Sequence, residues 1–419
     1  MSFILIAVFA VLLALSFPVA HALIIGSTVG VLSSDHLSPF GIIQQLYLPT
    51  QSYPMIAIPM FVIAGHLMMT GKLGNYLIAF ATDLVSRFRG GHAQVSVLGS
   101  TLFGGVSGSA VADATALGGV LIPWQVRMGY PKAFCGATIA AASTIDILIP
   151  PSIPLILFAL VSNASIGALF VAGILPGLLL AAGFLIVCNV SARIRGFPYE
   201  KQPISWAVVV RRALYAMPAL LMPVLVLIGL RFGVATPTEV STLAVIYALL
   251  ASAFIYRDLS WERVKGSLHS AGMATGVVML LIMASTSVGW ILTLEQIPAQ
   301  FLAWAQGSFT TQFGVIMLMN IVMLVVGMFI DLPAAILLLG PLFVPLARAY
   351  GIDLVQLGII MVVNLAIGLY TPPVGATLII GSMISRASIG QTVRELLPFY
   401  LVAVLVLLMM SYLPALTLH

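Results

Sequence analysis

The sequence Ile149-Pro150-Pro151-Ser152 places two consecutive prolines inside a strongly apolar segment, and Thr371-Pro372-Pro373-Val374 does the same in the second half of the chain. Ala164-Ser165-Ile166-Gly167 follows the first pair, and Ala387-Ser388-Ile389-Gly390 follows the second. We interpret this pattern as an internal repeat. Duplicated apolar halves with helices broken at matching positions are typical of secondary transporters, whose binding site lies between the repeats.

Acidic residues stand upstream of both proline pairs. Asp113 lies ten residues before Pro123, and Asp331 lies ten residues before Pro341. On this spacing we expect Asp113 and Asp331 to be equivalent positions of the two repeats. A carboxylate at membrane depth is costly and usually functional, so both acids are candidates for the site. The alternative is that each carboxylate caps the N-terminus of a half-helix.

The composition is that of a membrane protein. Hydrophobic residues make up 61% of the 419 residues and charged residues only 7%, against about 25% charged in an ordinary soluble domain. Apolar runs of about 20 residues, the length that crosses a lipid bilayer, recur from end to end. We therefore predict an all-α polytopic membrane protein with roughly ten to twelve crossings, several of them interrupted.

The net charge of +5 predicts an orientation in the membrane rather than nucleic-acid binding, because Lys and Arg mostly flank the apolar segments. Basic residues cluster within 193–212 and 257–265, which we expect to be cytoplasmic, and the 231–239 turn between them should be external. We divide the chain into a first membrane repeat (1–200), a cytoplasmic connecting segment (201–212) and a second membrane repeat (213–419). An odd number of crossings in each repeat would make the halves face opposite ways, and the sequence leaves that parity open.

Each proline pair removes two backbone N–H donors, so two carbonyls four residues earlier lose their helical partners. At the first pair these carbonyls belong to Asp146 and Ile147, and at the second to Gly368 and Leu369. Hydroxyl side chains stand beside both breaks, and clusters of oxygen atoms suit a hard cation such as Na⁺. The alternative is a kinked helix whose neighbours satisfy the freed carbonyls.

A second segment that favours a break is Gly104-Gly105-Val106-Ser107-Gly108-Ser109, which leads to Asp113. Glycine and serine at this density weaken a helix and favour the tip of a re-entrant hairpin. Close helix packing by small residues is the alternative. Gly327-Met328-Phe329-Ile330-Asp331 is the corresponding region of the second half.

Several classes of site are absent from the sequence. Cys135 and Cys188 are isolated in apolar segments, and the six histidines show no paired spacing. This spacing predicts no disulfide framework, zinc site or haem site. No phosphate-binding loop occurs, so we expect no ATP hydrolysis and no enzyme activity. A quinone-linked redox subunit is a competing class, and the missing His pairs and Cys clusters argue against it.

At these same residues the chain resembles the large membrane subunit (M subunit, DctM-like permease) of the tripartite ATP-independent periplasmic (TRAP) transporters. The resemblance covers nearly the whole chain. Its most specific motifs are Phe103-Gly104-Gly105-Val106-Ser107-Gly108-Ser109, Ile149-Pro150-Pro151-Ser152-Ile153-Pro154 and Asn364-Leu365-Ala366-Ile367-Gly368, the last followed by Thr371-Pro372-Pro373-Val374-Gly375.

The resemblance implies sodium-coupled import of a small organic acid, such as a dicarboxylate or a sialic acid, across the bacterial inner membrane. It implies an elevator mechanism with re-entrant hairpins, and two structural repeats that we expect to be inverted. It also implies two partners, a small four-helix membrane subunit and a periplasmic substrate-binding protein. We expect neither to be fused to this chain, which opens directly on its own first span.

The resemblance also implies two Na⁺ sites. Ser107, Ser109 and Ser152 would help to line one, and Gly368 and Thr371 with Asp331 would contribute to the other. The candidate cation ligands are Ser107, Ser109, Asp146, Ile147, Ser152, Asp331, Gly368, Leu369 and Thr371, and the candidate substrate contacts are Gly108, Asp113, Asn364 and Gly375.

One position departs from the family pattern. Asp146 stands where family members usually have glycine. It could add a cation ligand, accept a proton or pair with a basic residue, and the sequence leaves these open. The competing function for the whole chain is a sodium- or proton-coupled carboxylate carrier that needs no binding protein.

Overall fold

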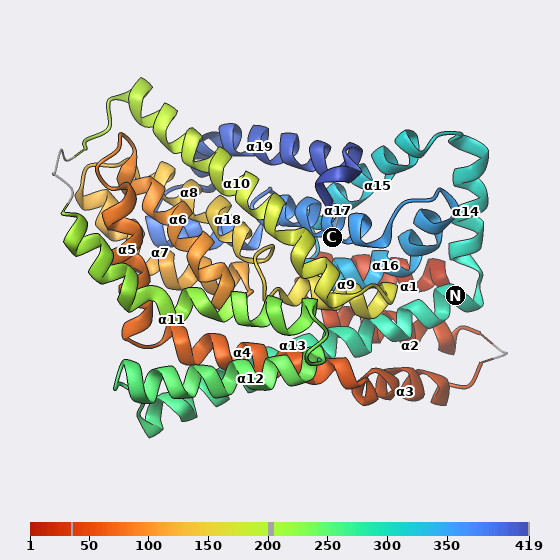
Figure 1. Cartoon of the computed structure of the whole chain (residues 1–419). Helices are drawn as coiled ribbons and strands as arrows, with labels where there is room; N and C mark the ends of the chain where they lie inside the picture. Colours follow the sequence, from red (N-terminus) through yellow and green to blue (C-terminus); the bar gives the residue numbers. More distant parts are fainter. Residues whose placement is uncertain (35–36, 200–204, 418–419) are drawn as a thin grey trace.

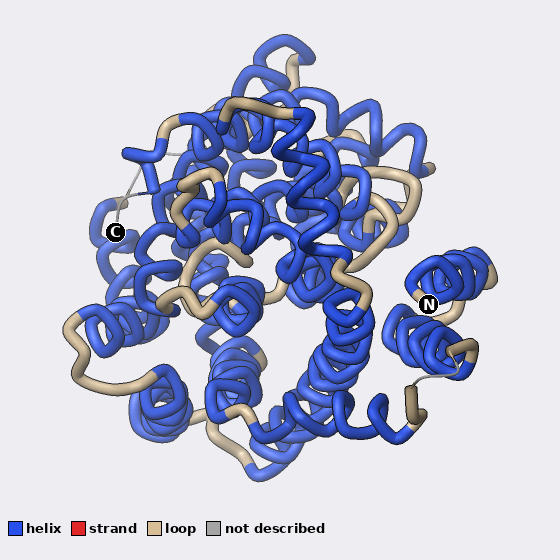
Figure 2. Tube along the Cα trace, turned by 90° about the vertical axis from the view of Figure 1, so that its right-hand side faces the viewer, coloured by secondary structure: helices blue, strands red, loops and turns tan. Residues whose placement is uncertain are grey.

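The computed structural model describes residues 1–34, 37–199 and 205–417. Within these ranges every regular element is a helix and no strand occurs, which confirms the all-α prediction (Figures 1 and 2). The long helices run side by side along the molecule in Figure 1, and Figure 2 shows many of them end-on. Residues 201–204 of the predicted connecting segment lie outside the described residues, and residues 206–212 form the first turns of a long helix.

The chain begins with a pair of short apolar helices, and further along it a sharp bend separates α4 from α5. α1 packs against α2, and α2 and α3 pack against the later helix α13. α4 and α5 are bent by 70° at a short break. The bounds are α1 Ser2–Ala14, α2 Val19–Leu32, α3 Phe40–Tyr47, η1 Leu48–Gln51, η2 Tyr53–Ile56, α4 Ala57–Met69, α5 Lys72–Val85 and α13 Trp261–Leu294.

The rest of the first half forms a hairpin, a broken helix and a long helix. The hairpin joins α6 to α7 through Gly108, whose φ of +64° suits a glycine. The break between α8 and α9 contains Pro150 and Pro151, joined by a cis peptide bond. The bounds are α6 Gly91–Ser107, α7 Ala110–Arg127, α8 Lys132–Asp146, α9 Ile153–Ser162, α10 Ile166–Arg195, α11 Trp206–Arg231, α12 Pro237–Leu250 and η3 Ala251–Ile255.

The second half passes through the same order of elements. After α13 and α14, a hairpin of α15 and α16 precedes a broken helix, α17 and α18, and a long helix, α19. The second break contains Pro372 and Pro373, again joined by a cis peptide bond. The bounds are α14 Ile297–Ser308, α15 Gln312–Gly327, α16 Leu332–Ala349, α17 Leu354–Leu369, α18 Ala376–Ser385, α19 Ile389–Tyr412 and η4 Pro414–Thr417.

Helix caps correct the predicted pairing of Asp113 with Asp331. Ser109 is the N-cap of α7 and Asp331 is the N-cap of α16, 222 positions apart (331 − 109). Asp113 lies inside the first turn of α7 instead. The prolines show the same separation, since Pro372 follows Pro150 by 222 positions. The same separation also pairs several other residues, Gly105 with Gly327, Pro123 with Pro345, Gly129 with Gly351 and Asp146 with Gly368.

The two central helices are α8 and α17. Every residue from Phe134 to Asp146 in α8 and from Val355 to Leu369 in α17 is buried. A helix that is apolar on all sides is stable only when other helices surround it. The C-terminal ends of these two helices, where the breaks occur, are therefore enclosed by protein.

Each hairpin covers parts of both broken helices. α6 and α7 pack against α8 of their own half, and α7 also packs against α18 of the other half. α15 and α16 pack against α17, and α16 also packs against α9. The contact of α8 with α18 is very close, because a Cβ on Gly381 would lie 2.5 Å from the carbonyl oxygen of Gly136. The halves are interlocked rather than merely adjacent.

Long uninterrupted spans are fewer than the ten to twelve crossings that we predicted, several of which we expected to be interrupted. Among the described residues, six helices have the length and apolarity to cross a membrane alone, or seven if the bent pair α4–α5 counts as one span. A further six apolar helices have only 10–17 residues, against the roughly 20 needed. The sequence stays apolar across the breaks between these short helices, so hydropathy alone does not show where the helices are interrupted.

The basic residues around 87–89 and those in 193–199, 205–212 and 257–265 lie at one end of the molecule, on the left in Figure 1. Arg212 pairs with Asp83 at 2.6 Å, and the guanidinium of Arg89 lies 5.4 Å from the ring centre of Tyr199. The backbone N–H of Lys72 donates to Asp258 at 2.8 Å. This grouping is what a shared cytoplasmic side requires, and the orientation itself stays a prediction.

Candidate functional site

The first hairpin tip, residues 107–109, is bound to the first broken helix by Asp146. The backbone N–H of Ser109 donates to one carboxylate oxygen at 2.7 Å, and that of Gly108 donates to the other at 3.2 Å. The Ser107 hydroxyl also interacts with this carboxylate. These amides lie at the N-terminus of α7, where unpaired N–H groups and the helix dipole favour a negative charge. Asp146 thus fills an anion-binding position with a side chain of the protein itself.

The first break, residues 147–152, is closed by Ser152. Its hydroxyl donates to the carbonyl of Ile147 and accepts the N–H of Leu155 at 3.3 Å, which caps α9. Gly108 lies directly against this break, because a Cβ on it would lie 2.5 Å from the carbonyl oxygen of Pro151. The structure therefore brings the predicted residues Ser107, Gly108, Ser109, Asp146, Ile147 and Ser152 together.

Asp113 lies close to this group and is completely buried. The Ser100 hydroxyl donates to its Oδ2 at 2.6 Å, while Oδ1 has no hydrogen-bond partner. Asp113 and Asp146 interact electrostatically. In the described part of the chain neither carboxylate forms an ion pair with a basic side chain, which leaves room for a cation as the balancing charge.

The second break, residues 370–375, satisfies its carbonyls differently. The carbonyl of Gly368 accepts the N–H of Thr371 at 3.0 Å, and that of Leu369 accepts the Thr377 hydroxyl at 3.0 Å. The Thr371 hydroxyl donates to the carbonyl of Ile367 at 2.6 Å. Protein donors therefore bind several of the backbone carbonyl oxygens that we expected to be free. A carbonyl oxygen has two lone pairs, so a second one remains for a ligand.

The second hairpin tip, residues 328–331, meets this second break. The N–H of Val374 donates to the carbonyl of Met328 at 3.3 Å. Gly368 packs against the backbone of Gly327 so closely that any Cβ would overlap its carbonyl oxygen. Gly375 begins α18 with a φ of +41°. Asp331 is exposed at the tip, as are Pro373 and Val374 at the break, whereas the first break is almost entirely buried.

Asn364, a predicted substrate contact, lies about one helical turn before Gly368 on α17. The amide of Asn364 donates to the carbonyl and side-chain oxygens of Asn320, at 3.0 and 2.9 Å, and so joins α17 to α15. It lies seven residues before Thr371, roughly 10 Å along the helix axis. These contacts join two helices, while the buried Oδ1 of Asn364 itself has no hydrogen-bond partner.

Sequence reasoning missed three polar residues that support the site. Ser100 holds Asp113, and Thr377 binds the carbonyl of Leu369 and, at 3.0 Å, that of Ala140 in α8. The Tyr400 hydroxyl donates to the carbonyl of Tyr370 at 2.6 Å. Thr377 could have been found from the sequence, because it carries a hydroxyl close to a proline pair. Ser100 and Tyr400 carry no local signal, because their partners are 13 and 30 residues away.

The donor set of these two groups consists of hydroxyls, carboxylates and backbone carbonyls. In the described ranges no group of three or more His, Cys, Asp and Glu side chains gathers in the way that a transition-metal site requires. Residues 6–416 match the family described as "Tripartite ATP-independent periplasmic transporter, DctM component". The chain belongs to this family.

Members of the DctM family with named substrates are similar over most of this chain. The C4-dicarboxylate TRAP transporter large permease protein DctM of Pseudomonas aeruginosa is 36% identical over 93% of this chain and 91% of its own length. The isethionate TRAP transporter permease protein DctMQ of Oleidesulfovibrio alaskensis is 34% identical over 97% of this chain and 64% of its own length. The DctM assignment identifies the chain as a transporter permease of the membrane, with organic acids as the substrate class of the family.

A solved structure shares the fold. The Alcanivorax borkumensis YdaH transporter, described as having an unusual topology, superposes with a TM-score of 0.56 over 87% of this chain and 84% of its own. Its sequence identity is 16%, so the likeness concerns the fold alone.

Proposed function

We propose that this chain is the large permease subunit of a TRAP system that imports a small organic acid across the bacterial inner membrane and couples that import to Na⁺. The observation that carries the proposal is the meeting of two hairpin tips with two broken helices, at Ser109–Asp146 in one half and at Met328–Val374 in the other. Broken helices with facing half-helix ends are the way in which secondary transporters bind ions and small anions at the bilayer midplane.

The moving body in this proposal consists of the two hairpins and the two broken helices. Their interlocked packing, with α7 on α18 and α16 on α9, favours movement as one unit. The fixed scaffold would include α4, α12 and α13, since α4 packs against both of the others. The repeated order of elements supports two repeats of inverted orientation, which alternating access commonly uses.

The first Na⁺ site would lie between the first hairpin tip and the first break. Ser107, Ser109 and Ser152 supply hydroxyl oxygens there, and Asp146 supplies a negative charge at membrane depth. The second site would lie between the second hairpin tip and the second break, with oxygens from Gly368, Leu369 and Thr371 and with Asp331 at its exposed side. Hard oxygen ligands without nitrogen or sulfur suit Na⁺.

The partners follow from the family rather than from any contact in this chain. We propose a small four-helix membrane subunit and a periplasmic substrate-binding protein. The DctMQ relative is longer than this chain, and its name combines the two membrane components. Selection among dicarboxylates, sulfonates and sugar acids would rest largely with the binding protein.

Reconstitution in liposomes tests this function. The complete system, with the small subunit, the binding protein and an inward Na⁺ gradient, should take up the organic acid that the binding protein carries. Uptake should stop when the Na⁺ gradient is collapsed and should not need ATP. Equal uptake by this chain alone would instead establish the stand-alone carrier, and uptake with an H⁺ gradient but no Na⁺ would contradict sodium coupling.

A further inference from the structure

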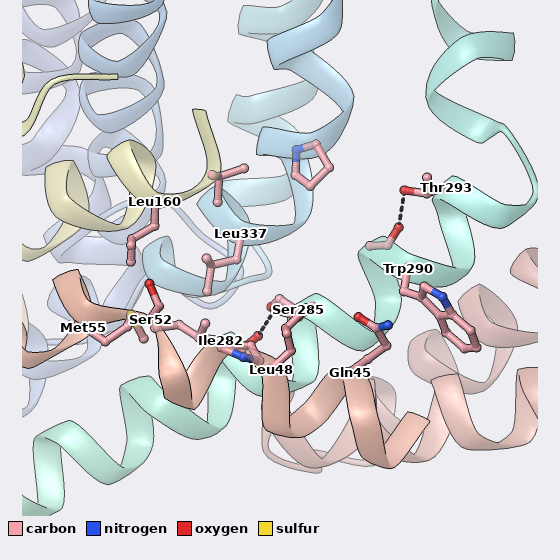
Figure 3. Close-up of a pocket in the computed structure, with 15 residues that line it drawn as sticks. Gln45, Leu48, Ser52, Met55, Leu160, Ile282, Ser285, Trp290, Thr293 and Leu337 are labelled. Carbon is pink, nitrogen blue, oxygen red and sulfur yellow. Dashed lines mark hydrogen bonds between the residues drawn. The ribbon is translucent and has the colours of Figure 1, made fainter. Parts of the chain in front are cut away.

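A cavity of about 480 Å³ lies apart from both hairpin tips. One wall is α13 with α3 and η1, and the opposite wall is formed by α9 and α16 (Figure 3). The volume is in the usual range of small-ligand sites, roughly 300–1,000 Å³. The residues that the next paragraphs use from its lining are Leu48, Ser285, Gly289, Trp290, Leu337 and Pro341.

The chemistry of the lining excludes the organic acid. No charged side chain lines the cavity, and a carboxylate moved there would lose its hydration without gaining a counter-charge. The walls are mainly apolar, with Trp290 at one side and Leu337 at the other (Figure 3). An uncharged, largely apolar ligand is the class that fits.

Polar residues in the lining are Gln45, Ser52, Ser285, Thr286 and Thr293. Ser285 and the carbonyl of Leu337 are the two polar groups that the proposal uses. The Ser285 hydroxyl is buried, with 4% of the residue exposed, and it has no hydrogen-bond partner. Pro341 has no N–H to donate to the carbonyl of Leu337 four residues earlier, and both residues line the cavity. A buried hydroxyl without a partner is costly, so an occupant that accepts a hydrogen bond there is favoured.

Exposed apolar side chains surround one edge of the cavity. Leu48, which lines the cavity, is 59% exposed, and the neighbouring Phe40, Ile43 and Tyr47 of α3 are similarly exposed large hydrophobic residues. Apolar side chains on the outside of a membrane protein contact acyl chains. The cavity is too small for another helix, whose diameter with side chains is roughly 10–12 Å.

We propose that this cavity binds one acyl chain of a membrane lipid, which enters past Leu48, packs against Trp290 and places its ester oxygen at the Ser285 hydroxyl. The bilayer supplies this ligand at high local concentration. The occupant contacts α13 and α16 at the same time. If the function proposed above is correct, these helices belong to the fixed and moving bodies, so a bound chain holds the two bodies in the present arrangement.

Gly289 and Gly276 provide a matched pair of variants on α13. A Cβ on Gly289 would meet only the Cγ of Pro341, at 3.9 Å, so a side chain at this position can start without a clash, and in Gly289→Leu it would extend into the cavity that Gly289 lines. A Cβ on Gly276 meets nothing within 4 Å, and Gly276 does not line the cavity. Gly276→Leu therefore adds the same side chain to the same helix elsewhere. Ser285→Leu fills the cavity from a second position.

Binding is tested by fluorescence in vesicles. The four tryptophans other than Trp290 are replaced by phenylalanine, and the protein is reconstituted in phosphatidylcholine with brominated or ordinary acyl chains. Brominated chains should quench Trp290 in the parent and in Gly276→Leu, and this quenching should be lost in Gly289→Leu and Ser285→Leu. Equal quenching in all four proteins would overturn the acyl-chain site.

The effect on transport is measured separately. In the complete reconstituted system, Gly289→Leu should lose most of its uptake, because an acyl chain can leave when the two bodies move whereas a leucine side chain stays fixed between them. Gly276→Leu should keep the parental rate. Equal uptake rates in Gly289→Leu and Gly276→Leu would contradict the proposal that the occupant of the cavity affects the movement of the two bodies. If quenching differs among the variants as expected but the parent shows no sodium-driven uptake, the proposed function is refuted and the lipid site is still established.

Discussion

The carboxylate of Asp146 lies 2.7 Å from the backbone nitrogen of Ser109, so the end of one half-helix caps the beginning of another. The two residues are 37 positions apart and belong to different elements. In the second half the equivalent of Asp146 is Gly368, which has no side chain and rests on the backbone of Gly327. The same junction is thus held by a charged side chain in one half and by bare backbone contact in the other.

Loss of this carboxylate should destabilise the protein. Asp146→Ala leaves two N–H groups at the N-terminus of α7 without an acceptor, one buried and one part-buried, and we expect a loss of about 2–4 kcal/mol. The midpoint of thermal unfolding of the purified protein measures it. Asp353→Ala is the control, because Asp353 also accepts two backbone N–H groups, at 2.8 and 3.1 Å, but its own side chain is exposed at the start of α17. Equal losses in the two variants would contradict the special contribution of Asp146.

Gly368 should tolerate no side chain. A Cβ at this position would overlap the carbonyl oxygen of Gly327, and forced displacement of packed backbone costs about 1–3 kcal/mol or more. We expect Gly368→Ala to lower both the yield of folded protein and the thermal midpoint. Gly390→Ala, where a Cβ meets nothing within 4 Å, should leave both unchanged. A normal thermal midpoint for Gly368→Ala would show that the contact between Gly368 and Gly327 is looser than described.

Thr371→Ala and Ser152→Ala should weaken Na⁺ binding. If each hydroxyl contributes to a cation site, its loss costs about 1–3 kcal/mol, or roughly tenfold to a hundredfold in apparent Na⁺ affinity. Uptake measured against Na⁺ concentration gives this value. Thr82→Ala is the control, since the Thr82 hydroxyl makes the same kind of bond to a carbonyl four residues earlier, at 2.7 Å, but lies on α5. Unchanged Na⁺ dependence in both test variants would make the proline breaks structural kinks.

The charge pattern predicts the sides of the membrane. Cysteines at Gly196 and Ser260 should be protected from an impermeant thiol reagent added outside intact cells, whereas one at Val234 should react. All three positions are exposed in the structure, and the native Cys135 and Cys188 are buried, which keeps the background low. Labelling of Gly196→Cys with protection of Val234→Cys would reverse the assigned orientation.

Local signals in the sequence predicted the breaks and the helical class. Proline removes a backbone donor wherever it stands, so Pro150 and Pro372 mark interrupted helices without any knowledge of their neighbours. Glycine at 108 similarly marks a turn, and its positive φ confirms that reading. These effects depend on the residue itself and are therefore readable from sequence.

Contacts between distant elements were not readable. Nothing near Asp146 in the sequence indicates that its partners are Gly108 and Ser109, because the contact depends on how α8 packs against the hairpin. The pairing of Asp113 with Asp331 was wrong for a related reason. α16 has two prolines in its interior, Pro341 and Pro345, and only a consistent register of helix ends shows which one corresponds to Pro123.

The interlocked packing has a consequence for the origin of the chain. Each hairpin lies against a half-helix that the other half supplies, α18 for the first and α9 for the second. If the halves descend from one duplicated gene, the ancestral polypeptide would have lacked a wall for its own hairpin. Such a polypeptide would complete its core by pairing with a second copy of itself. The ancestor of this protein would then have been a homodimer, and gene fusion only joined subunits that already depended on each other.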